Sequence, residues 1–436
     1  MWGVRIIAAC VALPVAALAQ PAPDAAPEHA ALHAQTTLVV QGNTAFPARF
    51  SGPQSLRARG ETRETVDVTV FAGFEPWPGA EIWINPEVDQ GFGLSNTLGA
   101  AGFPSGEAYK VGRAEPYLRL QRGFLRQTIA LGGAARTVTG DANVLARRTT
   151  EDRLVLTIGK FGVADVFDTN AYAHDPRGDF LNWTLIDAGA FDYPADAWGY
   201  SLGGAAELYW SKWTLRAGAF NLSTVPNSEI LETDFRQYGL VGEIERRVRV
   251  RGRPGAVRVL LFANRGRMAR LDDAVRLGAP GPPELEAARR FQTRVGASLN
   301  AEQEIARGVG LFLRASIADG RYEAFEFTDV DTSLSAGVVA GGERWDRPRD
   351  RAGLGAVVNA ASRQRQRFLA AGGLGILVGD GALPRPGEEW AFEGWYAWGA
   401  VRGLTLTADA QLIANPAYNR DRGPVPVLAL RVHAAF

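Results

Sequence analysis

The chain has 436 residues, with 47 basic and 47 acidic side chains, and this balance of charge argues against a nucleic-acid partner, which needs a basic surface. Its one cysteine, Cys10, lies near the start, so a disulfide framework and a cysteine nucleophile are not expected in the rest of the chain. The four histidines are scattered without metal-ligand spacing, and we therefore expect neither a histidine metal site nor a cofactor; the turn 175–179 leaves Ca²⁺ binding open, although it lacks EF-hand spacing.

The first residues have the pattern of a secretory signal. Arg5 precedes a short apolar run at 6–16, and small residues follow it. We interpret 1–19 as a signal peptide cleaved after Ala19, because the apolar run is shorter than the roughly 18 residues of a membrane-spanning helix. Residues 20–34, rich in Ala and Pro, are expected to form a flexible lead-in.

From residue 35 onward, apolar and polar residues alternate with the period of a β-strand. In 65–74, for example, Val66 and Val68 alternate with Asp67 and Thr69. One apolar and one polar face on each strand is typical of a barrel with lipid outside and water inside. The expected strands, about sixteen, cover 35–43, 65–74, 81–87, 124–131, 153–162, 198–209, 213–221, 238–251, 257–264, 293–304, 310–317, 332–340, 352–361, 390–400, 403–413 and 424–436.

The last strand suggests how the barrel closes. It carries an apolar face that ends on the aromatic Phe436, and pairing it with 35–43 would remove both edges of the sheet. Short turns alternate with long connections, of which 88–122 and 163–197 are the longest expected. A soluble propeller would instead show a repeat of roughly 40–50 residues, and none is visible. We predict an all-β, transmembrane, antiparallel barrel over 35–436.

Several motifs resemble those of one family. They are Trp77-Pro78-Gly79-Ala80-Glu81, Asn85-Pro86-Glu87, Gln90-Gly91-Phe92-Gly93-Leu94-Ser95-Asn96-Thr97, Phe167-Asp168-Thr169-Asn170, and the segments 175–183 and 415–424. Over about 35–436 the chain resembles the carbohydrate-selective outer-membrane porins of Gram-negative bacteria, the OprB-type family. The resemblance implies a sixteen-stranded barrel in the outer membrane, surrounded by lipid and lipopolysaccharide, through which mono- or oligosaccharides diffuse passively. It leaves open whether the barrels associate into oligomers.

A sugar has hydroxyl edges and apolar ring faces, so a sugar pore needs paired Arg and carboxylate groups with aromatic rings nearby. Inward-folded loops and the basic segment 113–126 are the expected source; if this segment lines the constriction, it should disfavour cations. The alternative is that these residues only cap loops through Arg–Asp bonds. The candidates for the pore constriction or for sugar binding are Glu87, Asp89, Tyr109, Lys110, Arg113, Arg119, Arg122, Arg126, Asp168, Asn170, Arg177 and Trp183.

The alternative function is a barrel hydrolase of the outer membrane. Such an enzyme needs a nucleophile and a base on facing strands or loops. Only His174, beside Asp175, lies in a suitable loop. We therefore do not expect an enzyme.

Overall fold

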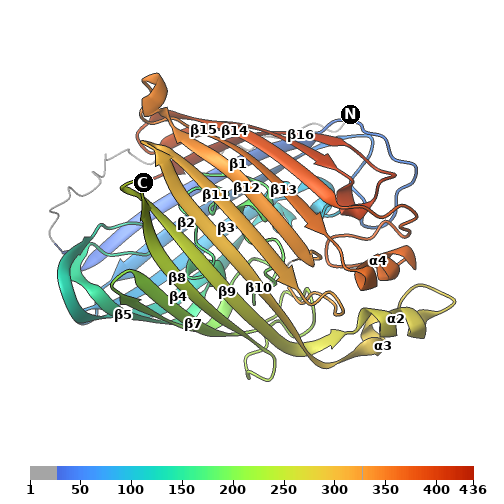
Figure 1. Ribbon diagram of the computed structural model, residues 1–436, viewed down its shortest axis with the longest axis horizontal. Helices are drawn as coiled ribbons and strands as arrows, with labels where there is room; N and C mark the ends of the chain where they lie inside the picture. Colours follow the sequence, from blue (N-terminus) through green and yellow to red (C-terminus); the bar gives the residue numbers. More distant parts are fainter. Residues whose placement is uncertain (1–26, 327) are drawn as a thin grey trace.

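The computed structural model describes residues 27–326 and 328–436, so the expected signal peptide lies outside the described residues. Sixteen antiparallel strands form one closed barrel in which each strand pairs with its neighbours in the sequence (Figure 1). The predicted fold class is therefore confirmed. No helix among the described residues is long and apolar enough to cross a membrane.

The strands are β1 Ala30–Asn43, β2 Glu61–Phe74, β3 Ala80–Gly91, β4 Arg113–Val138, β5 Arg147–Phe161, β6 Ser201–Trp210, β7 Trp213–Asn221, β8 Tyr238–Val250, β9 Arg253–Ala269, β10 Arg289–Ala306, β11 Val309–Ala318, β12 Thr332–Gly341, β13 Arg351–Ala360, β14 Glu389–Val401, β15 Leu404–Ala414 and β16 Val425–Ala435. Short helices lie in the connections: η1 Leu94–Asn96, η2 Val163–Asp165, α1 Trp183–Ile186, α2 Leu271–Gly278, α3 Leu285–Ala288, η3 Gly342–Trp345, α4 Arg363–Ala370 and η4 Pro416–Tyr418.

The barrel closes between the first and last strands, as the sequence predicted. The register of β1 against β16 runs from Gln35 opposite Ala435 to Asn43 opposite Val427. Beyond it, Ala34 and Phe436 exchange both backbone N–H···O bonds, at 3.1 and 2.8 Å. No edge of the sheet is therefore left open at this seam.

Several strand boundaries differ from the prediction, and two of the differences change which residues belong to the wall of the lumen. β1 begins at Ala30, so residues 30–34 belong to the wall and not to a flexible lead-in. β4 begins at Arg113, so the basic segment 113–126 is also part of the wall, whereas we expected it beside or within a long loop. The loop between β3 and β4 is correspondingly shorter, at 92–112.

The two faces of the wall differ in polarity. On β8, Glu243 and Glu245 point inward and are buried, while Leu240 and Ile244 point outward and are 47% and 42% exposed. Outward Leu, Ile and Val side chains suit lipid, and the inward charges suit an aqueous lumen partly filled by loops.

Eight tryptophans, at 77, 83, 198, 210, 213, 390, 395 and 398, lie at or near the ends of the expected strands, which predicts aromatic girdles at the membrane interfaces, and the structure shows them only in part. Five are 39–65% exposed on the described surface, namely Trp77, Trp210, Trp213, Trp390 and Trp398. The prediction is wrong for three that are buried inside the barrel, Trp83, Trp198 and Trp395. Position near a strand end therefore does not predict on which face of the wall a tryptophan ring lies.

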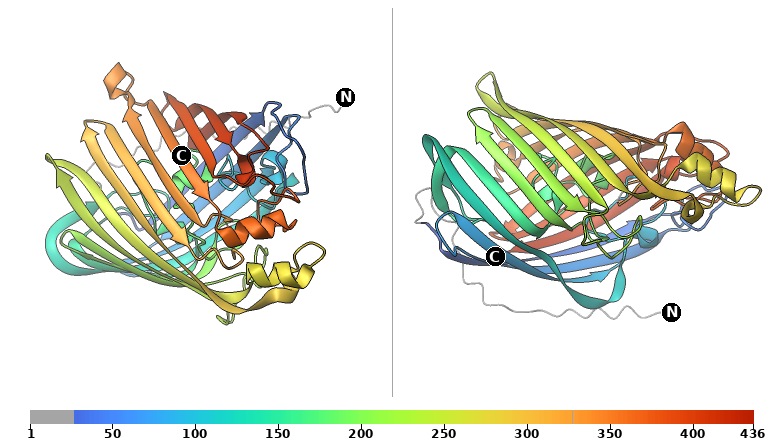
Figure 2. Two further views of the ribbon diagram at one scale, coloured as in Figure 1. Left: turned by 45° about the vertical axis from the view of Figure 1, so that its right-hand side comes forward. Right: turned by 90° about the horizontal axis from the view of Figure 1, so that it is seen from below.

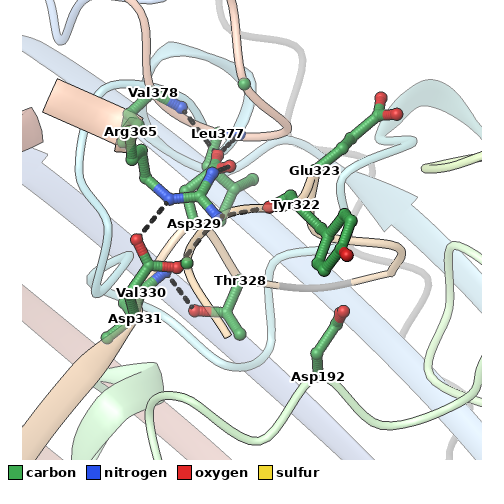
Figure 3. Close-up of polar contacts among 12 residues, drawn as sticks. Asp192, Tyr322, Glu323, Thr328, Asp329, Val330, Asp331, Arg365, Leu377 and Val378 are labelled. Atoms are coloured by element: carbon green, nitrogen blue, oxygen red, sulfur yellow. Dashed lines mark hydrogen bonds and ion pairs between the residues drawn. The ribbon is translucent and has the colours of Figure 1, made fainter. Parts of the chain in front are cut away.

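The two ends of the barrel differ. The C-terminus and the short turns lie at one end, and the long connections with α2, α3 and α4 lie at the other (Figure 1). At the long-loop end Arg365 of α4 donates to Asp331 at 2.9 Å and to Asp329 at 2.8 Å, and Asp329 also accepts from the backbone of Leu377 at 2.8 Å (Figure 3). This buried network fixes the connections 319–331 and 361–388 against each other.

Candidate pore constriction

Two long loops occupy the lumen. They are 92–112, between β3 and β4, and 162–200, between β5 and β6; loop segments cross the interior of the barrel in Figure 2. Backbone bonds join them, from Gly106 to Leu181 at 2.7 Å and from Trp183 to Phe103 at 3.0 Å. The Phe103 and Trp183 rings also stack at 5.0 Å. The two loops therefore form one unit inside the barrel.

Carboxylates of the wall hold this unit in place. Glu389 of β14 accepts from the backbone of Ala101 and Gly102 at 2.8 and 2.6 Å. Glu393, two inward positions further along β14, accepts from Leu181 and Asn182 at 2.5 and 2.8 Å. Backbone N–H groups that donate to a buried carboxylate form the stronger class of hydrogen bond, so these glutamates set the position of both loops.

Inside the barrel, Arg177 lies among four carboxylates, at 3.7–3.9 Å from each. Asp67 and Glu87 come from the wall, whereas Glu107 and Asp175 come from the two loops. We call these five residues the Arg177 cluster. Burial alone would lower the pKa of Arg177, but the surrounding carboxylates raise it, so the guanidinium stays charged. Burial holds the pKa of Glu107 well above its usual range.

A cavity of about 230 Å³ opens beside this cluster. A cavity of about 150 Å³ is known to accept benzene, so there is room here for one six-membered ring. Its aromatic and charged lining residues are Tyr109, Trp183, Tyr193, Trp198, Tyr200, Arg122, Arg177, Glu107, Asp165, Asp175, Asp187 and His174. We call this space the constriction cavity; it combines ring faces with donors and acceptors.

Two arginines of β4 face this region from the wall. Arg122 donates to Asp165 through Nε and Nη2 at 2.7 and 2.6 Å. Arg119 lies 3.4 Å above the ring of Trp198 and 3.7 Å from Asp196. The guanidinium of Arg119 therefore covers an aromatic face that a sugar ring could otherwise use.

Five of the predicted residues meet at the constriction: Glu87, Tyr109, Arg122, Arg177 and Trp183. Tyr109 donates to Glu87 at 2.8 Å, and Gln121 links Glu87 to Asp89 with two bonds of 3.2 Å. Asp89 therefore lies beside the group and is linked to it through Gln121.

The remaining candidates lie elsewhere. Asp168 and Asn170 both bond to Asn300 of β10, at 2.7 and 2.8 Å, on another part of the wall. Lys110 donates to the carbonyl of Glu326, and its burial lowers its pKa to about 8. Arg113 is exposed, and Arg126 donates to the carbonyl of Asn143, near the short-turn end.

Several lining residues were not predicted. Asp67 could have been found, because it lies on the polar face of a predicted strand. The loop residues Glu107, Asp165, Asp187 and Tyr193 have no periodic pattern that assigns them to the lumen, whereas Trp198 and Tyr200 fall in the predicted strand 198–209 but precede β6, which begins at Ser201. Only the path of the loops through the barrel brings them together.

The constriction cavity should respond to pH through Asp187. Burial raises the pKa of this carboxyl to about 6, although His174 at 3.6 Å lowers it and Asp168 raises it further. Above pH 6 the carboxylate is charged and attracts cations; below it, the group is neutral. We expect cation conductance to fall on the order of twofold from pH 7.5 to pH 5, and Asp187→Asn to remove most of that change. An unchanged titration in this variant would assign the effect to other groups.

A serine motif lies near the constriction but lacks the setting of a nucleophile. Residues Gly199-Tyr200-Ser201-Leu202-Gly203 fit the pattern Gly-x-Ser-x-Gly. Ser201, however, begins strand β6 and donates to the carbonyl of Asn221 at 2.6 Å, whereas a hydrolase places this serine on a strand-to-helix turn next to a histidine. Among the described residues, no group of three or more His, Cys, Asp or Glu side chains is arranged to hold a metal ion.

A closed sixteen-stranded barrel with a polar lumen and inward loops defines an outer-membrane channel of the porin type. The model of the carbohydrate-selective porin family, OprB, matches residues 53–436, and the chain belongs to this family. Because this family consists of porins, the protein is a channel and not the hydrolase that was considered as the alternative.

Solved structures have the same fold. The high-pH structure of OprB from Pseudomonas putida is 16% identical, with a TM-score of 0.68 and 94% of each chain covered. The outer-membrane channel DcaP of Acinetobacter baumannii is 10% identical, with a TM-score of 0.52 and coverage of 96% of this chain and 100% of its own. None of the curated proteins matches the sequence.

Proposed function

We propose that this carbohydrate-selective porin admits mono- or oligosaccharides through the constriction cavity, with Arg122, Arg177 and Trp183 as the residues nearest the sugar. The observation that carries the proposal is the cavity itself, which brings aromatic rings and oppositely charged groups together in the lumen. A guanidinium donates to sugar hydroxyls, and a carboxylate accepts from them.

The contacts in such a pore have to be weak. A hydrogen bond is worth about 1 kcal/mol net, or somewhat more with a charged partner. Several such bonds hold a sugar briefly, and a tight site would stop transport because the sugar could not leave. The long distances around Arg177, 3.7–3.9 Å, leave its donors open to hydroxyl groups or water.

The cellular setting is part of the proposal. The signal peptide 1–19 would direct export of the chain and then be cleaved, and the exposed apolar face of the wall would contact outer-membrane lipid and lipopolysaccharide. Association into oligomers would use that same outer face.

The test is block of the ion current by sugars in planar bilayers. Arg122→Gln should raise the sugar concentration for half-block about threefold to tenfold, through loss of one charged hydrogen-bond donor, and should raise cation conductance. Arg126→Gln is the matched control, because Arg126 lies on the same face of β4 but does not line the cavity. Equal block in wild type and in Arg122→Gln would contradict the assignment.

A further inference from the structure

A second, larger cavity of about 450 Å³ lies at the long-loop end, apart from the constriction cavity. It is lined by 51–59 of the β1–β2 connection, by Arg63 of β2, and by Ser95 and Asn96 of η1. We call it the mouth groove. It shares no lining residue with the constriction cavity, but η1 belongs to the loop 92–112 that continues into the lumen.

The groove is basic in a chain of zero formal charge. Arg57, Arg59 and Arg63 line it, and Arg57 and Arg59 are exposed. The carboxylate that pairs with this set is Glu61, at 3.0 Å from Arg63 and 3.9 Å from Arg57. Asp380, beneath the groove, accepts from Ser55 but pairs with the buried Arg422 at 3.8 Å, so Glu61 alone faces the three groove arginines and an excess of positive charge remains.

The groove is held rigidly. Arg422, buried beneath it, donates to the carbonyls of Phe50 and Leu56. The backbone N–H of Arg57 donates to Ser95 Oγ at 3.0 Å. Ser95 in turn donates to Glu61 through its backbone at 2.6 Å. A site fixed in this way loses little conformational entropy when a ligand binds.

The backbone at the edge of the groove is strained. Ser95, Asn96 and Thr97 have φ values of 50°, 60° and 63°, a left-handed run without glycine. This conformation is unfavourable for L-residues and most of all for the β-branched Thr97. Strain of this kind is concentrated at binding sites, and here it places the exposed Asn96 at the groove, where its amide can bond to a hydroxyl or to an anion.

We propose that the mouth groove binds the phosphate or carboxylate of an anionic saccharide. The planar guanidinium matches either group with two parallel hydrogen bonds, and its charge attracts the ligand over a distance of about 10 Å at moderate salt. This binding is additional to the diffusion of sugars through the constriction cavity. Two sources carry this chemistry, a free sugar acid or sugar phosphate and the phosphorylated core of lipopolysaccharide.

The experiment uses the full porin in planar bilayers, with glucose, glucuronate or glucose 6-phosphate added on the long-loop side. At low salt we expect the two acidic sugars to block at about a tenfold lower concentration than glucose, and Arg57→Gln/Arg59→Gln to remove that difference. Arg49→Gln/Arg385→Gln is the matched control, since both arginines are exposed at 72% and 55% but pair with Asp421 outside the groove. Block by glucose itself should be unchanged in both variants.

A second measurement identifies which of the two sources supplies the ligand. If the ligand is lipopolysaccharide, acidic sugars will show no advantage over glucose, and Arg57→Gln/Arg59→Gln will retain severalfold less lipopolysaccharide on purification than the control variant. The proposal is overturned if this variant keeps wild-type block by acidic sugars and wild-type retention of lipopolysaccharide. Failure of the constriction proposal would instead appear as glucose block that is equal in wild type and in Arg122→Gln.

Discussion

Replacing Arg177 with alanine should make the pore strongly cation-selective and abolish its block by sugars. The substitution removes the cation that lies 3.7–3.9 Å from four carboxylates. A charged cleft of one sign raises the local concentration of counter-ions on the order of tenfold or more, so the ratio of cation to anion permeability should rise strongly. The reversal potential under a salt gradient measures this ratio, and sugar block is measured in the same bilayer.

The matched variants separate charge from shape. Arg177→Lys keeps the charge without the planar donor fork, so it should keep ion selectivity but weaken sugar block. Arg177→Ala/Asp175→Asn removes one charged carboxylate as well and should recover part of the wild-type selectivity. An Arg177→Ala pore that assembles normally, with unchanged reversal potential and sugar block, would show that the cluster lies outside the permeation path. Heat-modifiable migration on a gel reports assembly.

The wall could be predicted from the sequence because each strand separates lipid from lumen. In β15, outward Leu412 is exposed and inward Gln411 is buried, as the alternation requires. β4 was predicted too short because its first half is rich in arginine, although Leu118 and Leu120 also alternate outward there at 72% and 53% exposure. The many charged residues at the start of β4 obscured this alternation, so the first half of the strand was not recognised from the sequence.

The constriction could be predicted only in part. Glu87 and Arg122 are on strands, where the period assigns a face. Glu107, Asp165 and Asp187 lie in loops, where the direction of a side chain depends on contacts with distant strands. The contacts that decide it, such as those of Glu393 with Leu181 and Asn182, join residues more than 200 positions apart. No local pattern in the sequence encodes such pairs.

The second large effect is expected from these wall glutamates. In Glu389→Ala/Glu393→Ala, four charged hydrogen bonds to the lumen loops are lost, each worth about 1.5–3 kcal/mol. The barrel itself should still close, because its strand pairing does not depend on either side chain. The loops 92–112 and 162–200 should then leave their fixed position. Single-channel conductance should increase severalfold and fluctuate, and sugar block should disappear.

Controls make this prediction specific. Glu393→Gln keeps an oxygen acceptor for Leu181 and Asn182 and should give an intermediate conductance. Glu207→Gln changes a wall carboxylate that bonds to Arg216 and Tyr209 and does not touch the two loops, so it should leave the loops in place. A double variant that assembles and conducts like wild type would mean that the backbone bonds between the loops, such as Trp183 to Phe103, are sufficient to hold them. If conductance instead rises in the order wild type, Glu393→Gln, Glu389→Ala/Glu393→Ala, the wall carboxylates determine the width of the pore, because they alone differ across the series.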